Sequence, residues 1–221
     1  MPTTRPVAML LAFALSCPTL ATTPAARAQS LEAAGLTQAG SAAYTAGDLG
    51  TAARYFEVAG RRGNRLAQFN FAMMLYRDEA HSPDANAGWR WLRRAAQAGL
   101  AQAQFTFAQL YAHGEGVERR MSTAAEWYRR AAHQGHIEAQ IALGNLYFSG
   151  RDVDRDYASA AHWYRLAAGG GSAAAQARIA LMYEHGYGVA QSLALARHWY
   201  LEAARHGHPD ALTRARALGA D

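Results

Sequence analysis

Nine histidines are the side chains of this 221-residue chain best suited to metal binding or acid–base chemistry. Some are closely spaced, with His133 and His136 three residues apart and His206 and His208 two apart. A metal site needs three or four ligand side chains that converge on one point, together with neighbouring groups that hydrogen-bond to these ligands and orient them. These pairs instead lie beside glycines at the expected ends of helices, where the helix dipole favours an imidazolium that needs no other role. We therefore expect no metal site.

Other catalytic chemistries lack their essential residues. All 22 basic residues are arginine, which excludes a P-loop, a Schiff-base lysine and a Ser-x-x-Lys nucleophile. The chain contains no Gly-x-Ser-x-Gly or His-Glu-x-x-His motif, and Gly169–Gly171 falls at a recurring turn rather than after a strand. Nothing assembles a nucleophile with a base and an orienting acid. We predict a non-catalytic protein without a cofactor; the alternative is a secreted hydrolase of cell-wall or β-lactam-like substrates.

One pattern of residues recurs five times along the chain at a spacing of 36 residues. Pairs of alanines, a glycine and an Ala-Gln pair follow an aromatic column at fixed distances. The column consists of Tyr55-Phe56, Trp91-Leu92, Trp127-Tyr128, Trp163-Tyr164 and Trp199-Tyr200. A period of this length is typical of a solenoid, in which each unit buries its apolar face against its neighbours.

Each unit is predicted to contain two helices. The first, as at 122–134, has apolar residues at i, i+3, i+4, i+7 and i+8, from Ala124 to Ala132. It ends at a glycine such as Gly135, where a residue with positive φ is needed. The second helix, as at 138–148, ends near a Gly-x-Gly-Val turn of the kind formed by residues 114–117.

These residues resemble the Sel-1-like repeats, a branch of the tetratricopeptide superfamily. Residues 124–153 are similar to the family unit Ala-x-x-Trp-Tyr-x-x-Ala-Ala-x-x-Gly-x-x-x-Ala-Gln-x-x-Leu-Gly-x-x-Tyr-x-x-Gly-x-Gly-Val, and the resemblance covers about residues 40–212. It implies an all-α fold, a right-handed α-solenoid of about five helix-turn-helix units with a 36-residue period and a C-terminal capping helix at 209–218. The first unit has Asp78–Pro83 in place of the glycine turn, and Gly47-Asp48 makes it closer to an ordinary tetratricopeptide unit.

Residues 1–28 are predicted to be a cleaved secretory signal peptide. A short positive end precedes an apolar stretch, Pro6–Leu20, and Ala26-Arg27-Ala28 offers a small-x-small cleavage site before Gln29. We expect the mature domain, 29–221, in the periplasm or secreted.

No later segment reaches the ~20 apolar residues of a membrane-spanning helix, so we expect no stable membrane insertion. The alternative is a lipid-anchored envelope assembly factor acylated at Cys17. Ala14-Leu15-Ser16 is a poor acylation box, because it lacks a leucine three residues before the cysteine.

The net charge is +5, and loss of Arg5 and Arg27 with the signal would leave +3. This charge is too small to indicate nucleic-acid binding. Arginine pairs such as Arg93-Arg94 and Arg129-Arg130 follow the aromatic column on an expected solvent face. The simpler interpretation is a solvated face, and contact with an acidic partner or an anionic glycan stays open. We expect a monomer.

Positions that the repeat leaves free indicate the function. In the second helix, residues aligned with 141, 145 and 148 vary between units and share one face, and the resemblance implies that this helix lines a concave surface. The predicted partner-binding residues are Phe69, Met73, Tyr76, Phe105, Gln109, Ile141, Asn145, Phe148 and Leu181. The alternative is that these side chains pack against adjacent helices. Exposed apolar area of this kind favours a protein partner. We predict a periplasmic scaffold that binds an envelope protein or peptide segment in this groove, as an adaptor or regulator in signalling, secretion or assembly.

Overall fold

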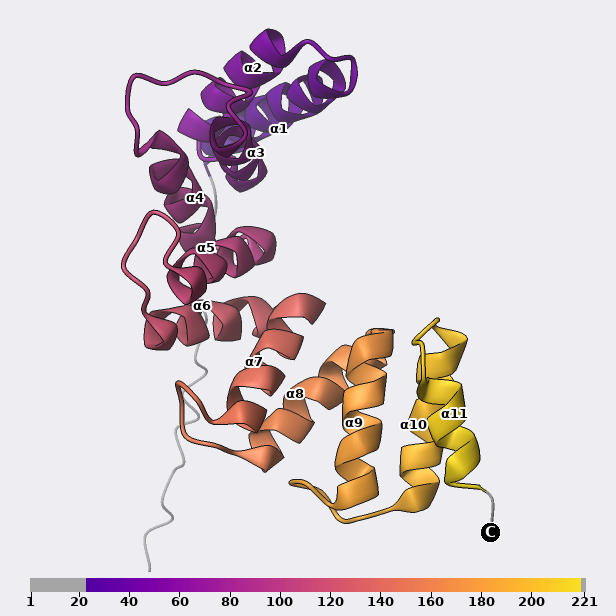
Figure 1. The fold of residues 1–221 in the computed structure, drawn as a ribbon. Coiled ribbons are helices and arrows are strands. Elements are labelled where there is room, and N and C mark those ends of the chain that lie inside the picture. Colours follow the sequence, from indigo (N-terminus) through magenta and orange to yellow (C-terminus); the bar gives the residue numbers. More distant parts are fainter. Residues whose placement is uncertain (1–22, 220–221) are drawn as a thin grey trace, which may run out of the picture.

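The structure is a computed structural model that describes residues 23–219 as an array of eleven helices without strands. Their bounds are α1 (Pro24–Thr45), α2 (Leu49–Arg61), α3 (Arg65–Tyr76), α4 (Ala87–Gln97), α5 (Ala101–His113), α6 (Met121–His133), α7 (Ile137–Ser149), α8 (Tyr157–Gly169), α9 (Ala173–His185), α10 (Leu193–Arg205) and α11 (Ala211–Ala217). The main packing contacts join helices that are consecutive in the sequence. Figure 1 shows them following one another along a curved path. The predicted all-α solenoid is confirmed.

The units are pairs formed by α2 with α3, α4 with α5, α6 with α7 and α8 with α9, and α10 with the shorter α11 completes the series. We refer to the even-numbered member of each pair as the first helix and to the odd-numbered member as the second helix. The long helix α1 precedes the first pair and packs on α2. Within residues 23–219, no helix combines the length and hydropathy needed to cross a bilayer.

Alanines allow the helices of neighbouring units to approach closely. Ala95, Ala131 and Ala167 are completely buried in the first helices. The tryptophan of the aromatic column then fills the space between units. The Trp91 ring meets the Phe71 ring edge-on, with ring centroids 5.4 Å apart. At Gly60, an added Cβ would lie 3.0 Å from the same ring. Because the interior is close-packed, small and large residues must alternate in this register.

The first helices end as predicted. Gly135 has a φ of 85°, and the following backbone N–H, that of His136, donates to the Ala131 carbonyl at 3.2 Å. Glycines at the same position of the other units have φ values of 82° to 88°. This left-handed turn aims the chain back along the array, so the second helix packs on the first.

A buried glutamine ties the two helices together in the four units from α2–α3 to α8–α9. The side-chain amide of Gln104 donates to the Ala96 carbonyl at 3.1 Å, which satisfies a backbone acceptor at the end of α4. The equivalent bonds join Gln68 to Gly60, Gln140 to Ala132 and Gln176 to Ala168, at 2.9 to 3.2 Å. This accounts for the glutamine of the repeated Ala-Gln pair.

The N-terminal part of the array differs from the other units. Residues 77–86 form a longer loop in place of the glycine turn, with Asp78 at a φ of 56°. Helix α1 begins at Pro24, so the predicted cleavage site before Gln29 falls near the start of this helix. Cys17 and most of the predicted signal lie outside the described residues. Cleavage and acylation stay predictions.

Candidate functional site

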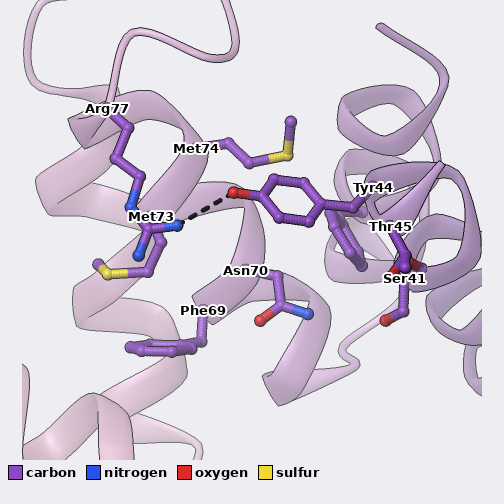
Figure 2. Close-up of a pocket in the computed structure, with 9 residues that line it drawn as sticks. Ser41, Tyr44, Thr45, Phe69, Asn70, Met73, Met74 and Arg77 are labelled. Carbon is purple, nitrogen blue, oxygen red and sulfur yellow. Dashed lines mark hydrogen bonds between the residues drawn. The ribbon is translucent and has the colours of Figure 1, made fainter. Parts of the chain in front are cut away.

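A pocket of about 250 Å³ opens between α1, α2 and α3. Figure 2 shows side chains of α3 on one side and side chains of α1 across from them. The lining residues are Ser41, Tyr44 and Thr45 of α1, Phe56 of α2, Phe69, Asn70, Met73 and Met74 of α3, and Arg77, which directly follows α3. We call it the α1–α3 pocket.

The floor of this pocket is apolar. Phe56 and Met74 are almost fully buried, and Phe69 and Met73 are half-buried against the same core. Methionine is flexible and polarisable, so it adapts to side chains of different shape. The pocket can therefore accept an apolar group without a strict shape requirement.

The rim of the pocket is polar and carries a cation. The Arg77 guanidinium donates to the Tyr44 hydroxyl at 3.2 Å, the dashed line in Figure 2. The Tyr44 hydroxyl in turn lies 3.0 and 3.1 Å from the two carboxylate oxygens of Glu79. Arginine has five N–H donors, so most of those of Arg77 remain available to an anionic group.

The predicted site residues do not gather into one cavity. Phe69 and Met73 line the α1–α3 pocket, and Asn145 lines a second pocket described below. Tyr76 lies against Gly88 and lines a separate hollow under the loop 77–86.

Several of the other predicted residues contribute to packing between units. The Phe105 ring stacks on His136 with centroids 4.6 Å apart and lies 5.6 Å from the Tyr128 ring. Ile141 and Phe148 are half-buried against the core that α8 and α9 form. Gln109 and Leu181 are half-buried on α5 and α9. Some members of the set therefore line pockets and others pack against neighbouring units, and partner binding stays a prediction for all of them.

One histidine has a role that differs from our expectation. His136 does not sit at the end of a first helix as an imidazolium; it is the N-cap of α7. Its Nδ1 accepts the Ala139 backbone N–H at 3.3 Å, while Nε2 lies 3.0 Å from the Gln102 amide oxygen. Burial lowers the pKa of His136, against a smaller opposing effect of Glu138. Only a neutral ring accepts the capping bond, because both nitrogens of imidazolium are donors.

No group of three or more His, Cys, Asp or Glu side chains is placed to hold a metal within residues 23–219. The sequence interpretation missed Ser41, Tyr44 and Arg77, because it considered only positions within the repeat pattern. Extending the 36-residue register toward the N-terminus would have aligned α1 with the second helices.

The fold and its pockets define a class of protein: a solenoid of tandem helix pairs with ligand-sized hollows along the second helices. Four consecutive segments match the model of the Sel1 repeat, at residues 65–100, 101–136, 137–172 and 173–208. The chain belongs to the Sel1 repeat family. Sel1 repeats generally serve as non-catalytic scaffolds and bind other proteins.

Solved structures share this fold. A Sel1 repeat protein from Oxalobacter formigenes is 30% identical with a TM-score of 0.74, over 79% of this chain and 72% of that one. The protein c5321, a protective antigen of uropathogenic Escherichia coli, is 29% identical with a TM-score of 0.75, over 87% of this chain but 46% of its own. A putative Sel1 repeat protein from Klebsiella pneumoniae, 17% identical, has a TM-score of 0.51 over 90% of this chain and 97% of its own. Among curated proteins, no sequence matches significantly.

Proposed function

We propose that this protein is an exported, non-catalytic scaffold that binds a segment of another protein along its second helices. The observation that carries this proposal is the α1–α3 pocket, an open apolar hollow with an arginine at its rim that forms no salt bridge with a described residue. Phe69 and Met73 are half-buried, and the part of their surface that stays accessible lies in this pocket. Apolar surface that is left open in this way favours a protein partner.

The chemistry of the pocket supports binding rather than turnover. The Tyr44 hydroxyl is held between Arg77 and Glu79, and the Ser41 hydroxyl donates to the Thr37 carbonyl at 3.1 Å. We interpret both hydroxyls as fixed polar walls, because each is already engaged by these partners: a backbone carbonyl for Ser41, and Glu79 and Arg77 for Tyr44. A peptide segment would place a side chain on the apolar floor and an anionic group beside Arg77.

The proposed setting is the cell envelope, after removal of residues 1–28. Export is supported by the charged start, the apolar stretch and the small-x-small site of the sequence. A role as adaptor or regulator in signalling, secretion or assembly agrees with a scaffold that offers a binding surface along its second helices.

Site-specific photo-crosslinking in cells tests the function. A photoreactive amino acid at Met73 would report contacts in the pocket, and the same group at Arg165, an exposed residue of the first helix α8, is the control. We expect discrete protein adducts from position 73 only. Equal adduct patterns from both positions, or none from position 73, would contradict binding at this face.

A further inference from the structure

A second pocket, of about 380 Å³, opens between α5, α6 and α7. Its lining residues are Ala112 and His113 of α5, Met121 and Tyr128 of α6, Ala142, Asn145, Leu146 and Ser149 of α7, and Arg151 of the following loop. We call it the α5–α7 pocket.

The two pockets occupy the same place in the repeat, two units apart. A shift of 72 residues, twice the repeat length, superimposes most of one lining on the other. The equivalent residues are Ser41 and His113, Phe56 and Tyr128, Asn70 and Ala142, Met73 and Asn145, Met74 and Leu146, and Arg77 and Ser149. The hollow therefore occurs at the same register position in two places along the array.

The α5–α7 pocket has polar groups without a hydrogen-bond partner among the described residues. In the tyrosine column, the Tyr164 hydroxyl donates to Asn145 Oδ1 at 2.7 Å and the Tyr200 hydroxyl donates to Glu184 at 2.8 Å. The Tyr128 hydroxyl, in contrast, makes no hydrogen bond to another described residue. Burial alone raises the pKa of Tyr128, so its hydroxyl stays a neutral donor. The bond from Tyr164 occupies Asn145 Oδ1 and leaves the Asn145 amide hydrogens for a ligand.

Each rim carries an arginine that forms no salt bridge with a described residue. At the first pocket, Arg77 donates to the Tyr44 hydroxyl, which also donates to the Glu79 carboxylate. At the second pocket, Asp152 is held by Arg119 at 3.0 Å through both carboxylate oxygens, while no described residue forms a salt bridge with Arg151. A ligand with an apolar side chain and an adjacent carboxylate complements both pockets.

We propose that the α1–α3 and α5–α7 pockets bind one extended acidic peptide segment, with one aliphatic side chain in each pocket and a carboxylate beside Arg77 and beside Arg151. This inference rests on the proposed function and specifies the partner's chemistry. At the second pocket, Tyr128 and the Asn145 amide bind the backbone of the segment, because a hydroxyl and an amide match peptide carbonyls.

Two linked contacts give a distinctive binding signature. Once one side chain is seated, the second pocket meets its ligand at an effective concentration of about millimolar when the spacing is right. A peptide with two correctly spaced anchors then binds at least about tenfold more tightly than a peptide with one. The advantage disappears when the spacer is too short to reach both pockets.

Fluorescence anisotropy with synthetic peptides tests this inference. The probes are labelled peptides composed of serine and threonine that carry either one or two Leu-Glu pairs. In the two-pair peptides, spacers of graded length separate the pairs. The protein variants are Arg77→Ser, Arg151→Ser and their combination. Serine is the residue that the α5–α7 pocket itself has at the position equivalent to Arg77. Arg165→Ser, on α8, removes the same charge away from both pockets and is the matched control.

We expect one-to-one binding with an optimal spacer, and about tenfold weaker binding of the two-pair peptide to each single variant. Arg165→Ser should bind like the parent protein. The proposal would be overturned if one-pair and two-pair peptides bound with equal affinity, or if two peptides bound to each protein molecule. It would also be overturned if Arg165→Ser lost as much affinity as the pocket variants. Self-association that the peptides displace would make a second copy the occupant and would also overturn it. If adducts form at position 73 while none of these peptides bind, the scaffold function stands and this partner chemistry is wrong.

Discussion

The side-chain amide of Gln134 donates a 2.7 Å hydrogen bond to the amide oxygen of Gln104, thirty residues earlier in the preceding unit. His206 makes the equivalent contact at 2.9 Å to Gln176. At the first junction, the position that corresponds to Gln134 is Ala98, and the Gln68 amide oxygen is buried without a partner. A buried acceptor without a partner destabilises the folded state.

Ala98→Gln is therefore expected to stabilise the protein. The new amide would donate to Gln68 and raise the free energy of unfolding by about 0.5–1.5 kcal/mol. Chemical denaturation measures the change. Ala98→Met is the control, because methionine has a similar length and no donor. Equal stabilisation by methionine would show that packing, and not the hydrogen bond, is responsible.

Gly144→Ala is expected to destabilise the junction between α7 and α8. An added Cβ would lie 2.5 Å from a ring carbon of Tyr164, which is fully buried and cannot move aside freely. Overpacking of this kind costs about 1–3 kcal/mol. The double variant Gly144→Ala with Tyr164→Leu has an alanine and a leucine at these two positions. The equivalent residues two units earlier are Ala72 and Leu92. In thermal or denaturant unfolding, the double variant should lose less stability than the two single losses added together, and strict additivity would argue against the contact.

The repeat register was predictable from the sequence because it depends on local geometry and residue volume. Gly135 was predicted to end a helix and has positive φ, and Ala132, expected in the alanine column, is buried. The N-cap role of His136 depends on Gln102 and Phe105 of the preceding unit, which no local pattern reveals.

The candidate site was less predictable for a physical reason. An apolar residue on the second helix serves equally well in an open groove and in a junction between units. Met73 faces a pocket, whereas Phe105 packs against Tyr128. In the sequence, both are simply apolar residues at positions of the second helix that the repeat leaves free. Tyr44 and Ser41 come from α1, which aligns with the second helices, but no aromatic pair lies 36 residues before Tyr55-Phe56 to mark the start of a unit there.

Serine substitutions should separate the two kinds of position. Phe105→Ser removes a ring that contacts Tyr128 and His136, and we expect a loss of stability of about 2–3 kcal/mol. Met73→Ser truncates a half-buried side chain and should cost about half as much. In the crosslinking experiment, with the photoreactive group moved to Asn70, Met73→Ser should nevertheless reduce adduct formation. If Met73→Ser unfolds the protein and Phe105→Ser does not, the roles assigned to these residues are reversed.

Intact-mass measurement of the protein purified from cells will test its processing. We expect a mature chain that starts at Gln29, carries no lipid and is found in the periplasmic fraction. Replacing Ala28 by a bulky residue should block cleavage there and leave the precursor mass. A chain that starts at Cys17 with added acyl mass would instead establish a lipid anchor.

The stability of the protein should fall on acidification through His136. Burial lowers the pKa of this side chain from its ordinary value of 6.5, so the unfolded chain binds a proton more readily than the folded one. The stabilisation is fully present above about pH 6.5 and is lost as the pH falls toward the lowered pKa, because protonation ends the capping bond to Ala139. Glu138 opposes this effect, with 3.4 Å between its carboxylate and Nδ1, and the neighbouring Gln102 and Phe105 are uncharged.

His136→Asn provides the matched test of this pH dependence. Asparagine caps α3 in the first unit, where the Asn64 side chain accepts the Ala67 N–H at 2.9 Å, and it does not titrate. At pH 7.5, we expect His136→Asn and the parent protein to unfold at similar denaturant concentrations. Between pH 7.5 and pH 5, we expect His136→Asn to lose less stability than the parent protein. His136→Ala should lose about 1 kcal/mol at pH 7.5, because it removes the cap altogether. If the parent protein and His136→Asn show the same slope of stability against pH, the acid sensitivity originates elsewhere and His136 is not its source.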